Sequence, residues 1–143
     1  PCKALVDLDY AFIQAVEDGY LQDNDPDIVA CRNEMAQLAP AHGINLNNGW
    51  PTKRHSAMTS AEAFALLASQ QNLQANISNL KTKLQAHNIW IWKKGTIETH
   101  LNLQSKTESE WANFVNQVES NSLTTTLPYG HTEIEDCINW RLN

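Results

Sequence analysis

The sequence predicts an α/β fold in which a short parallel sheet is flanked by helices. Two apolar segments, ALVDLD (residues 4–9) and NIWIW (residues 88–92), have the length and the residue types of buried strands. Helical spacing of apolar side chains dominates the chain between them. Each strand runs directly into a polar cluster, which is where sheets of this class commonly form ligand sites.

The composition predicts one domain over residues 1–143 with its own hydrophobic core. The chain has 143 residues, of which 42% are hydrophobic and 18% are charged. No apolar run approaches the roughly 20 residues of a membrane span, and the first residues lack the pattern of a signal peptide. Three cysteines without metal-ligand spacing favour free thiols. We therefore expect a cytoplasmic protein without a membrane partner.

Charge is distributed unevenly along the chain, whose net charge is −6. Residues 1–34 hold eight acids against two bases, residues 35–106 hold seven bases against two acids, and residues 107–143 hold six acids against one base. A basic segment beside an acidic one favours a site where cations neutralise carboxylates and lysines meet phosphate. Lys81 and Lys83 are interpreted instead as solvated residues of a helix face.

Helix signals follow the first strand. Residues 10–21 predict one or two helical turns. Asp25 can cap the next helix with Pro26 at its first position, and Gly43 ends it. The apolar positions of that helix are Ile28, Cys31, Met35 and Leu38.

The sequence of the middle of the chain predicts a loop followed by a helical segment. The loop covers residues 45–55. A helix begins at Thr59 or Ser60, with Glu62 in its first turn, and continues either unbroken or with a break near residues 70–72.

The end of the chain predicts a strand and two helices. Residues 88–92 form a strand that we expect to be buried on both faces. Two short amphipathic helices over residues 108–120 and 132–142 finish the chain, with irregular structure between them.

The first strand ends in two aspartates, Asp7 and Asp9, with one residue between them. Carboxylates this close repel each other, so a chain that holds them together commonly binds a cation or uses them as nucleophile and acid. Because parallel strands end at the same edge of a sheet, we expect Asp7 and Asp9 to lie at the edge that carries Gly95, Thr96 and Glu98.

The segments LVDLDYAF and IWIWKKGTIETHL together resemble the metal-binding half of a Toprim domain, which is a Rossmann-like layer. More narrowly, they are similar to the C-terminal nuclease region of the overcoming-lysogenisation-defect (OLD) family of ATP-dependent endonucleases. In that family one strand ends in Asp-x-Asp, and a later strand ends in Gly, a small hydroxyl residue, any residue and Glu. The resemblance covers residues 3–111.

The resemblance implies a nuclease site with two Mg²⁺ or Mn²⁺ ions about 4 Å apart. Its metal ligands would be Asp7, Asp9, Thr96 and Glu98. Glu98 also counts as a catalytic residue, together with Lys106, the lysine that follows it. We expect the phosphate backbone of DNA to contact Lys53, Arg54, Lys93 and Lys94.

The family implies partners as well as a site. They are DNA, an ATPase domain or subunit of the same system, and a second copy in a homodimer. The family's Toprim domain also begins with an earlier strand that carries a glutamate motif. We expect that motif and the ATPase to lie outside residues 1–143, which makes this chain the C-terminal part of a larger nuclease domain.

Two other functions remain open at this stage. A haloacid-dehalogenase-type phosphatase would use Asp7 as nucleophile and Asp9 as general acid, although Ala11 departs from that family's pattern. A Toprim-derived module that binds partners without cutting is the other. Trp50, in a loop beside Lys53, is interpreted as a core residue or as a platform for a base.

Overall fold

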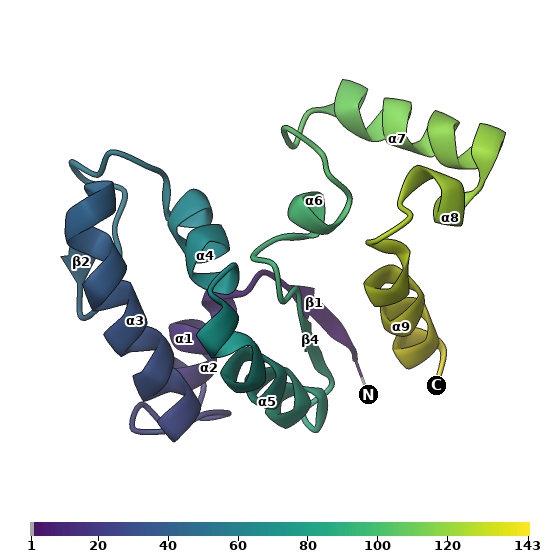
Figure 1. The fold of residues 1–143 in the computed structure, drawn as a ribbon. Helices are drawn as coiled ribbons and strands as arrows, with labels where there is room; N and C mark the ends of the chain where they lie inside the picture. Colours follow the sequence, from purple (N-terminus) through teal and green to yellow (C-terminus); the bar gives the residue numbers. More distant parts are fainter. Residues whose placement is uncertain (1) are drawn as a thin grey trace. The chain divides into compact units, whose positions relative to one another are not determined.

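The computed structural model describes residues 2–143 (Figure 1). The chain forms two compact units, one that ends at Thr96 and one from Ile97 to Asn143, and each is described by itself. The predicted α/β class is confirmed, because a two-stranded parallel sheet is flanked by helices. Within the described residues, no helix combines the length and the apolar character needed to cross a bilayer.

Strands β1 (Ala4–Val6) and β4 (Ile89–Ile91) form the parallel pair of the first unit, with Ala4 opposite Ile89 and Val6 opposite Ile91. All three residues of β4 are buried, as predicted. The expectation of a buried β1 was wrong, since Ala4 is exposed and Leu5 is 48% exposed. Within residues 2–143, β4 is the one strand that pairs with β1.

Helices α1 (Asp9–Phe12), α2 (Gln14–Glu17) and α3 (Pro26–His42) follow β1, at the positions predicted. The side chain of Asp25 caps α3 by accepting a hydrogen bond of 2.9 Å from the backbone N–H of Asp27. Gly43 ends α3 in the left-handed conformation, with φ +61°.

The predicted loop after α3 contains a small antiparallel hairpin, β2 (Leu46–Asn47) and β3 (Trp50–Pro51). Asn48 and Gly49 both have positive φ, +51° and +83°, which matches a two-residue hairpin turn. Trp50 is buried, and its ring stacks on Phe12 with centroids 4.5 Å apart. Trp50 is therefore a core residue, and its ring is not an open platform for a base.

Helix α4 (Ser60–Ala68) begins with a capping box, in which Thr59 and Glu62 exchange side-chain and backbone hydrogen bonds. The 3₁₀ turn η1 (Gln71–Leu73) then separates α4 from α5 (Gln74–Gln85). The interrupted form of the predicted helix is thus the observed one.

One hydrophobic core holds the first unit together. α5 packs against β4, and α3 packs against α4 and α5, so helices lie on one side of the strand pair (Figure 1). Cys31 of α3 is fully buried in this core, and burial raises the pKa of its thiol to about 12. The Cys31 thiol is therefore unreactive at neutral pH.

Lys83 joins α5 to the start of α3, and the prediction that it only solvates a helix face was wrong. Its ammonium donates to both carboxylate oxygens of Asp25, at 2.9 and 2.7 Å, and to Asp27 at 2.8 Å. Asn76 and Asn79 donate to the other oxygen of Asp27, at 2.9 and 3.2 Å. Five hydrogen bonds thus tie the acidic start of α3 to α5.

The same prediction was wrong for Lys81. Its side chain is buried, and its ammonium lies 3.6 Å from the centre of the Trp90 ring. A long aliphatic stem lets the lysine cover apolar surface while its charge faces the negative ring face.

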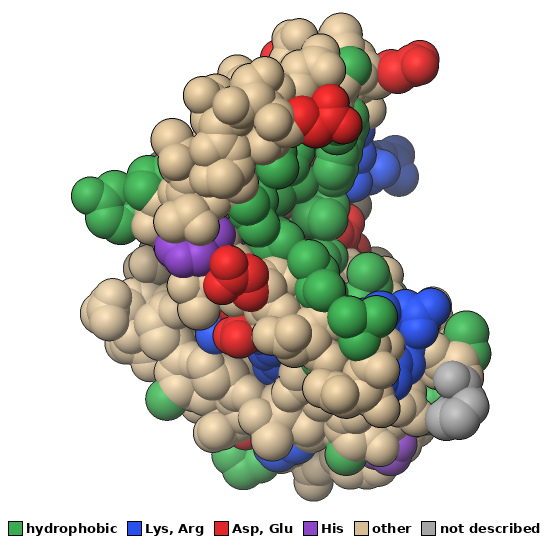
Figure 2. Space-filling model, turned by 90° about the vertical axis from the view of Figure 1, so that its right-hand side faces the viewer, with side chains coloured by type: hydrophobic (Ala, Val, Ile, Leu, Met, Phe, Trp, Pro, Cys, Tyr) green, Lys and Arg blue, Asp and Glu red, His purple; other side chains and the backbone are tan. Residues whose placement is uncertain are grey.

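The second unit contains α6 (Ile97–His100), α7 (Glu108–Asn121), α8 (Leu123–Thr126) and α9 (His131–Leu142). Helices α7 and α9 match the predicted pair, whereas α8 lies in the segment expected to be irregular. No residue of α7 is buried. Four large hydrophobic side chains of this unit are exposed: Val115, Tyr129, Ile138 and Leu142. Figure 2 shows one face of the molecule, on which hydrophobic side chains are coloured green.

Replacement of Asp27 by Asn is expected to lower the free energy of unfolding at pH 7 by about 1–2 kcal/mol. Burial alone would raise the pKa of Asp27, but hydrogen bonds from Lys83, Asn76 and Asn79 outweigh burial and hold that pKa below its usual value of 3.8. Such a carboxylate stabilises the fold above its unfolded pKa, and this contribution is lost as pH falls through the lower folded value.

The free energy of unfolding in urea, measured at several pH values from about 2 to 7, tests this effect. The wild type should lose stability on acidification more steeply than Asp27→Asn. Asp136→Asn, which changes an exposed acid on α9, should keep the wild-type slope. Parallel slopes for Asp27→Asn and the wild type would contradict the assignment.

Candidate functional site

The segments that follow β1 and β4 stay paired beyond the ends of the strands. The backbone N–H of Trp92 donates to the carbonyl of Val6 at 3.2 Å, and that of Leu8 donates to the carbonyl of Gly95 at 2.8 Å. These bonds fix the backbone on both sides of Asp7 and just before Thr96. Both polar clusters are therefore held at one edge of the sheet.

Leu8 explains the spacing of the two aspartates. Its side chain is fully buried in the core, while Asp7 is half-buried and Asp9 is exposed. The residue between the acids is thus an apolar anchor that holds them at the rim. The repulsion between the carboxylates is opposed by the packing of Leu8 and of Phe12 on the following turn.

Gly95 brings the end of β4 close to α4. Its φ is +111°, and a Cβ atom there would lie 3.3 Å from the Cα and 3.4 Å from the Cβ of Ala65. A residue with a side chain would be strained in this conformation and would crowd α4. Glycine thus allows the strand end and the helix to enclose one hollow.

A hollow of about 170 Å³ lies at this edge of the sheet. It is lined by Asp7, Asp9, Lys53, Ser60, Ala61, Phe64, Gly95 and Thr96. Of the residues predicted from the sequence, the structure brings together Asp7, Asp9, Thr96 and Lys53. Thr96 is 9% exposed, so its side chain is part of the wall and not of the outer surface.

The hollow contains groups that suit both a cation and an anion. Two carboxylates and a hydroxyl are oxygen ligands, which Mg²⁺ and Mn²⁺ prefer. Lys53 favours negative charge instead. The first turn of α4 does so as well, because the backbone N–H groups of Ser60 and Ala61 point out of the helix there. A phosphate bound to a divalent cation carries both a negative and a positive charge, so it matches both sets of groups.

A complete protein ligand set is not needed for such a cation. In residues 2–143, no three His, Cys, Asp or Glu side chains gather in a metal-binding group. Mg²⁺ is commonly held by one or two carboxylates while waters and substrate phosphates complete its shell. The pair of Asp7 and Asp9 fits that pattern.

Ser60 and Ala61 are members of the site that sequence reasoning missed. The helix start at Thr59 or Ser60 was predicted, and the capping box confirms it. The position of this helix start beside the strand ends depends on how α4 packs against the core. That packing cannot be inferred from the local sequence.

The other predicted phosphate contacts lie outside the lining of the hollow. Lys93 and Lys94 occupy the turn between Trp92 and Gly95, with Lys93 half-buried and Lys94 exposed. Arg54 is exposed in the loop after β3, where its Nε donates to His55 at 3.4 Å. Their contacts with nucleic acid stay predictions.

Glu98 and Lys106 belong to the second unit. The ammonium of Lys106 lies 3.8 Å from Oε2 of Glu98, a long ion pair. The side chain of Glu98 is 12% exposed and that of Lys106 is 66% exposed. Oε2 of Glu98 is buried and accepts no hydrogen bond within the described residues. The catalytic and metal roles of these two residues stay predictions.

Comparisons with protein-family models, with curated proteins and with solved structures find no match to this chain.

Replacement of Gly95 by Ala is expected to lower the free energy of unfolding by about 1–3 kcal/mol. An alanine is strained at this positive φ, and its Cβ would also crowd α4. Gly19→Ala is the matched control. Gly19 also has positive φ, +79°, but nothing lies within 4 Å of its Cβ position.

Urea unfolding of both variants separates conformational strain from contact with Ala65. Gly95→Ala should lose more stability than Gly19→Ala, because the Cβ at residue 95 meets α4 whereas the Cβ at residue 19 has nothing within 4 Å. Equal losses in Gly95→Ala and Gly19→Ala would show that the approach of β4 to α4 is not tight.

Proposed function

We propose that the hollow at the ends of β1 and β4 binds a divalent cation and that this chain takes part in metal-dependent cleavage of nucleic-acid phosphodiesters. One observation carries the proposal. Asp7, Asp9 and Thr96 meet Lys53 and the first turn of α4 around a single hollow at the carboxyl ends of two parallel strands. Sheets of this class place ligands at that edge.

The acidic residues of the hollow would bind the cation, and its positively charged groups would bind the phosphate. Asp7 and Asp9 would hold Mg²⁺ or Mn²⁺, with the hydroxyl of Thr96 beside them. The cation supplies stabilisation of the negative charge that develops on the attacking and leaving oxygens. Lys53 and the N–H groups of Ser60 and Ala61 orient the phosphate by attracting its remaining oxygens.

The resemblance to the OLD-family nucleases supports the same chemistry and adds further parts to the proposal. It adds Glu98 as a ligand, Lys106 as a catalytic lysine, DNA as the substrate and an ATPase as the partner. A homodimer and a second cation belong to the same resemblance, whereas the proposed cytoplasmic location rests on the free thiols that the sequence favours. Cation binding tests the proposed site most directly, because Asp7 and Asp9 themselves would hold the cation.

Titration of Mn²⁺ into the protein by calorimetry is expected to show binding that Asp7→Asn and Asp9→Asn each weaken by about tenfold or more, since each removes a charged ligand. The Asn side chain keeps the size of Asp, so circular dichroism should stay unchanged. Asp136→Asn, the matched change at an exposed acid of α9, should bind Mn²⁺ like the wild type.

Two results would overturn the proposal. One is unaltered Mn²⁺ affinity in both Asp7→Asn and Asp9→Asn. The other is no binding by the wild type at millimolar Mn²⁺, which would favour a module that binds partners without catalysis.

The role carried over for Glu98 has its own test. Glu98→Gln should weaken Mn²⁺ binding by about tenfold if this carboxylate is a ligand. Lys106→Met, which removes the cation 3.8 Å from Glu98, should leave Mn²⁺ affinity at or above that of the wild type. Wild-type affinity in Glu98→Gln would remove Glu98 from the proposed ligand set and leave Asp7 and Asp9 in place.

A further inference from the structure

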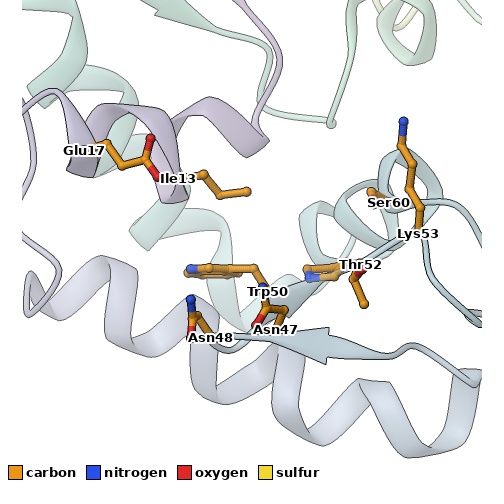
Figure 3. A pocket seen from close by; sticks show the side chains of 9 residues that line it. Ile13, Glu17, Asn47, Asn48, Trp50, Thr52, Lys53 and Ser60 are labelled. Atoms are coloured by element: carbon orange, nitrogen blue, oxygen red, sulfur yellow. The ribbon is translucent and has the colours of Figure 1, made fainter.

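A second, larger cavity of about 520 Å³ lies next to the hollow, and the two share Lys53 and Ser60. Figure 3 shows that Ile13 and Glu17 extend from one side, while Trp50, Asn47 and Asn48 come from the hairpin opposite. Lys53 and Ser60 close the end toward the hollow. The volume lies in the range of small-molecule sites, about 300–1,000 Å³.

The wall of this cavity has a rigid apolar part. Trp50 is 6% exposed and is fixed by its stacking on Phe12. Pro51 is buried beside it. Ile13 faces them from the segment between α1 and α2 and is 39% exposed. A flat apolar group would therefore be covered by Ile13 on one side and by the edge of the hairpin on the other.

Polar side chains around the cavity are available to a ligand. Within residues 2–143 the side chains of Glu17, Asn47, Asn48, Lys53 and Ser60 form no hydrogen bond or ion pair with the protein. A carboxylate only accepts hydrogen bonds, an ammonium only donates them, and amides do both. This mixture matches the edge of a nucleobase, which carries donors and acceptors side by side.

We propose that this cavity takes the base and sugar of one unpaired nucleotide, whose phosphate lies toward the hollow at Lys53 and Ser60. The inference rests on the proposed function and specifies its substrate as single-stranded or locally opened nucleic acid. The base must be unpaired, since its hydrogen-bonding edge faces Glu17, Asn47 and Asn48 and not a partner base.

Binding of deoxyguanosine monophosphate in the presence of EDTA tests the cavity without any cation. Guanine is chosen because neighbouring N–H groups on its pairing edge can donate to the carboxylate of Glu17. Titration followed by NMR should shift the indole N–H resonance of Trp50 and the backbone resonances of Asn47 and Asn48 in a saturable way.

Substitution of residues that line the cavity should weaken nucleotide binding, whereas a substitution elsewhere should not. Ile13→Ala and Glu17→Gln should each weaken binding by about tenfold. Val29→Ala is the matched control, because Val29 is 36% exposed on α3 and does not line the cavity. A single-stranded oligonucleotide should show the same order of affinities, whereas a blunt duplex should not discriminate Ile13→Ala from the wild type.

The inference is wrong if the nucleotide causes no saturable shift, or if Ile13→Ala and Glu17→Gln bind it as the wild type does. This failure is distinct from failure of the proposed function. Asp7→Asn should weaken Mn²⁺ binding but bind the nucleotide in EDTA at least as tightly as the wild type, because it removes a negative charge from the hollow, so the two sites can be judged separately.

Discussion

The parallel pairing of β1 with β4 is the constraint on which the rest of the structure depends. Each strand has three residues, yet β4 is buried throughout and is covered by α5. The hydrogen bond from Leu8 to Gly95 carries the pairing past the strands and into the two polar clusters. Residues almost ninety positions apart in the sequence thereby share one hollow, and the positive φ of Gly95 lets α4 close its side.

The acids of the first unit serve two different purposes. Asp25 and Asp27 share the ammonium of Lys83, and Asn76 and Asn79 also donate to Asp27, so this cluster ties two helices together. Asp7 and Asp9 are held instead at a hollow, by the burial of the residue between them. Acidic side chains close in sequence are thus divided between stability and a proposed site, and geometry rather than residue type makes the division.

Local signals in the sequence predicted much of this structure. The Asp25–Pro26 start and Gly43 end of α3, the capping box at Thr59 and the apolar run of β4 act within a few residues, so they are visible in the sequence. The hairpin was missed although Asn48–Gly49 is a strong turn signal. The positions of Lys81 over Trp90 and of Ser60 beside Asp7 depend on the packing of distant helices and strands, which no local pattern encodes.

The location of a bound cation tests the central claim most directly. Mn²⁺ is paramagnetic and broadens the NMR signals of nearby protons, so substoichiometric Mn²⁺ should selectively broaden the backbone amide signals around the hollow, in residues 7–9, 60–61 and 95–96. The signals of residues 84–88, which lead into the opposite end of β4, should broaden less. Broadening centred elsewhere, for example on Asp25 and Asp27, would contradict the account.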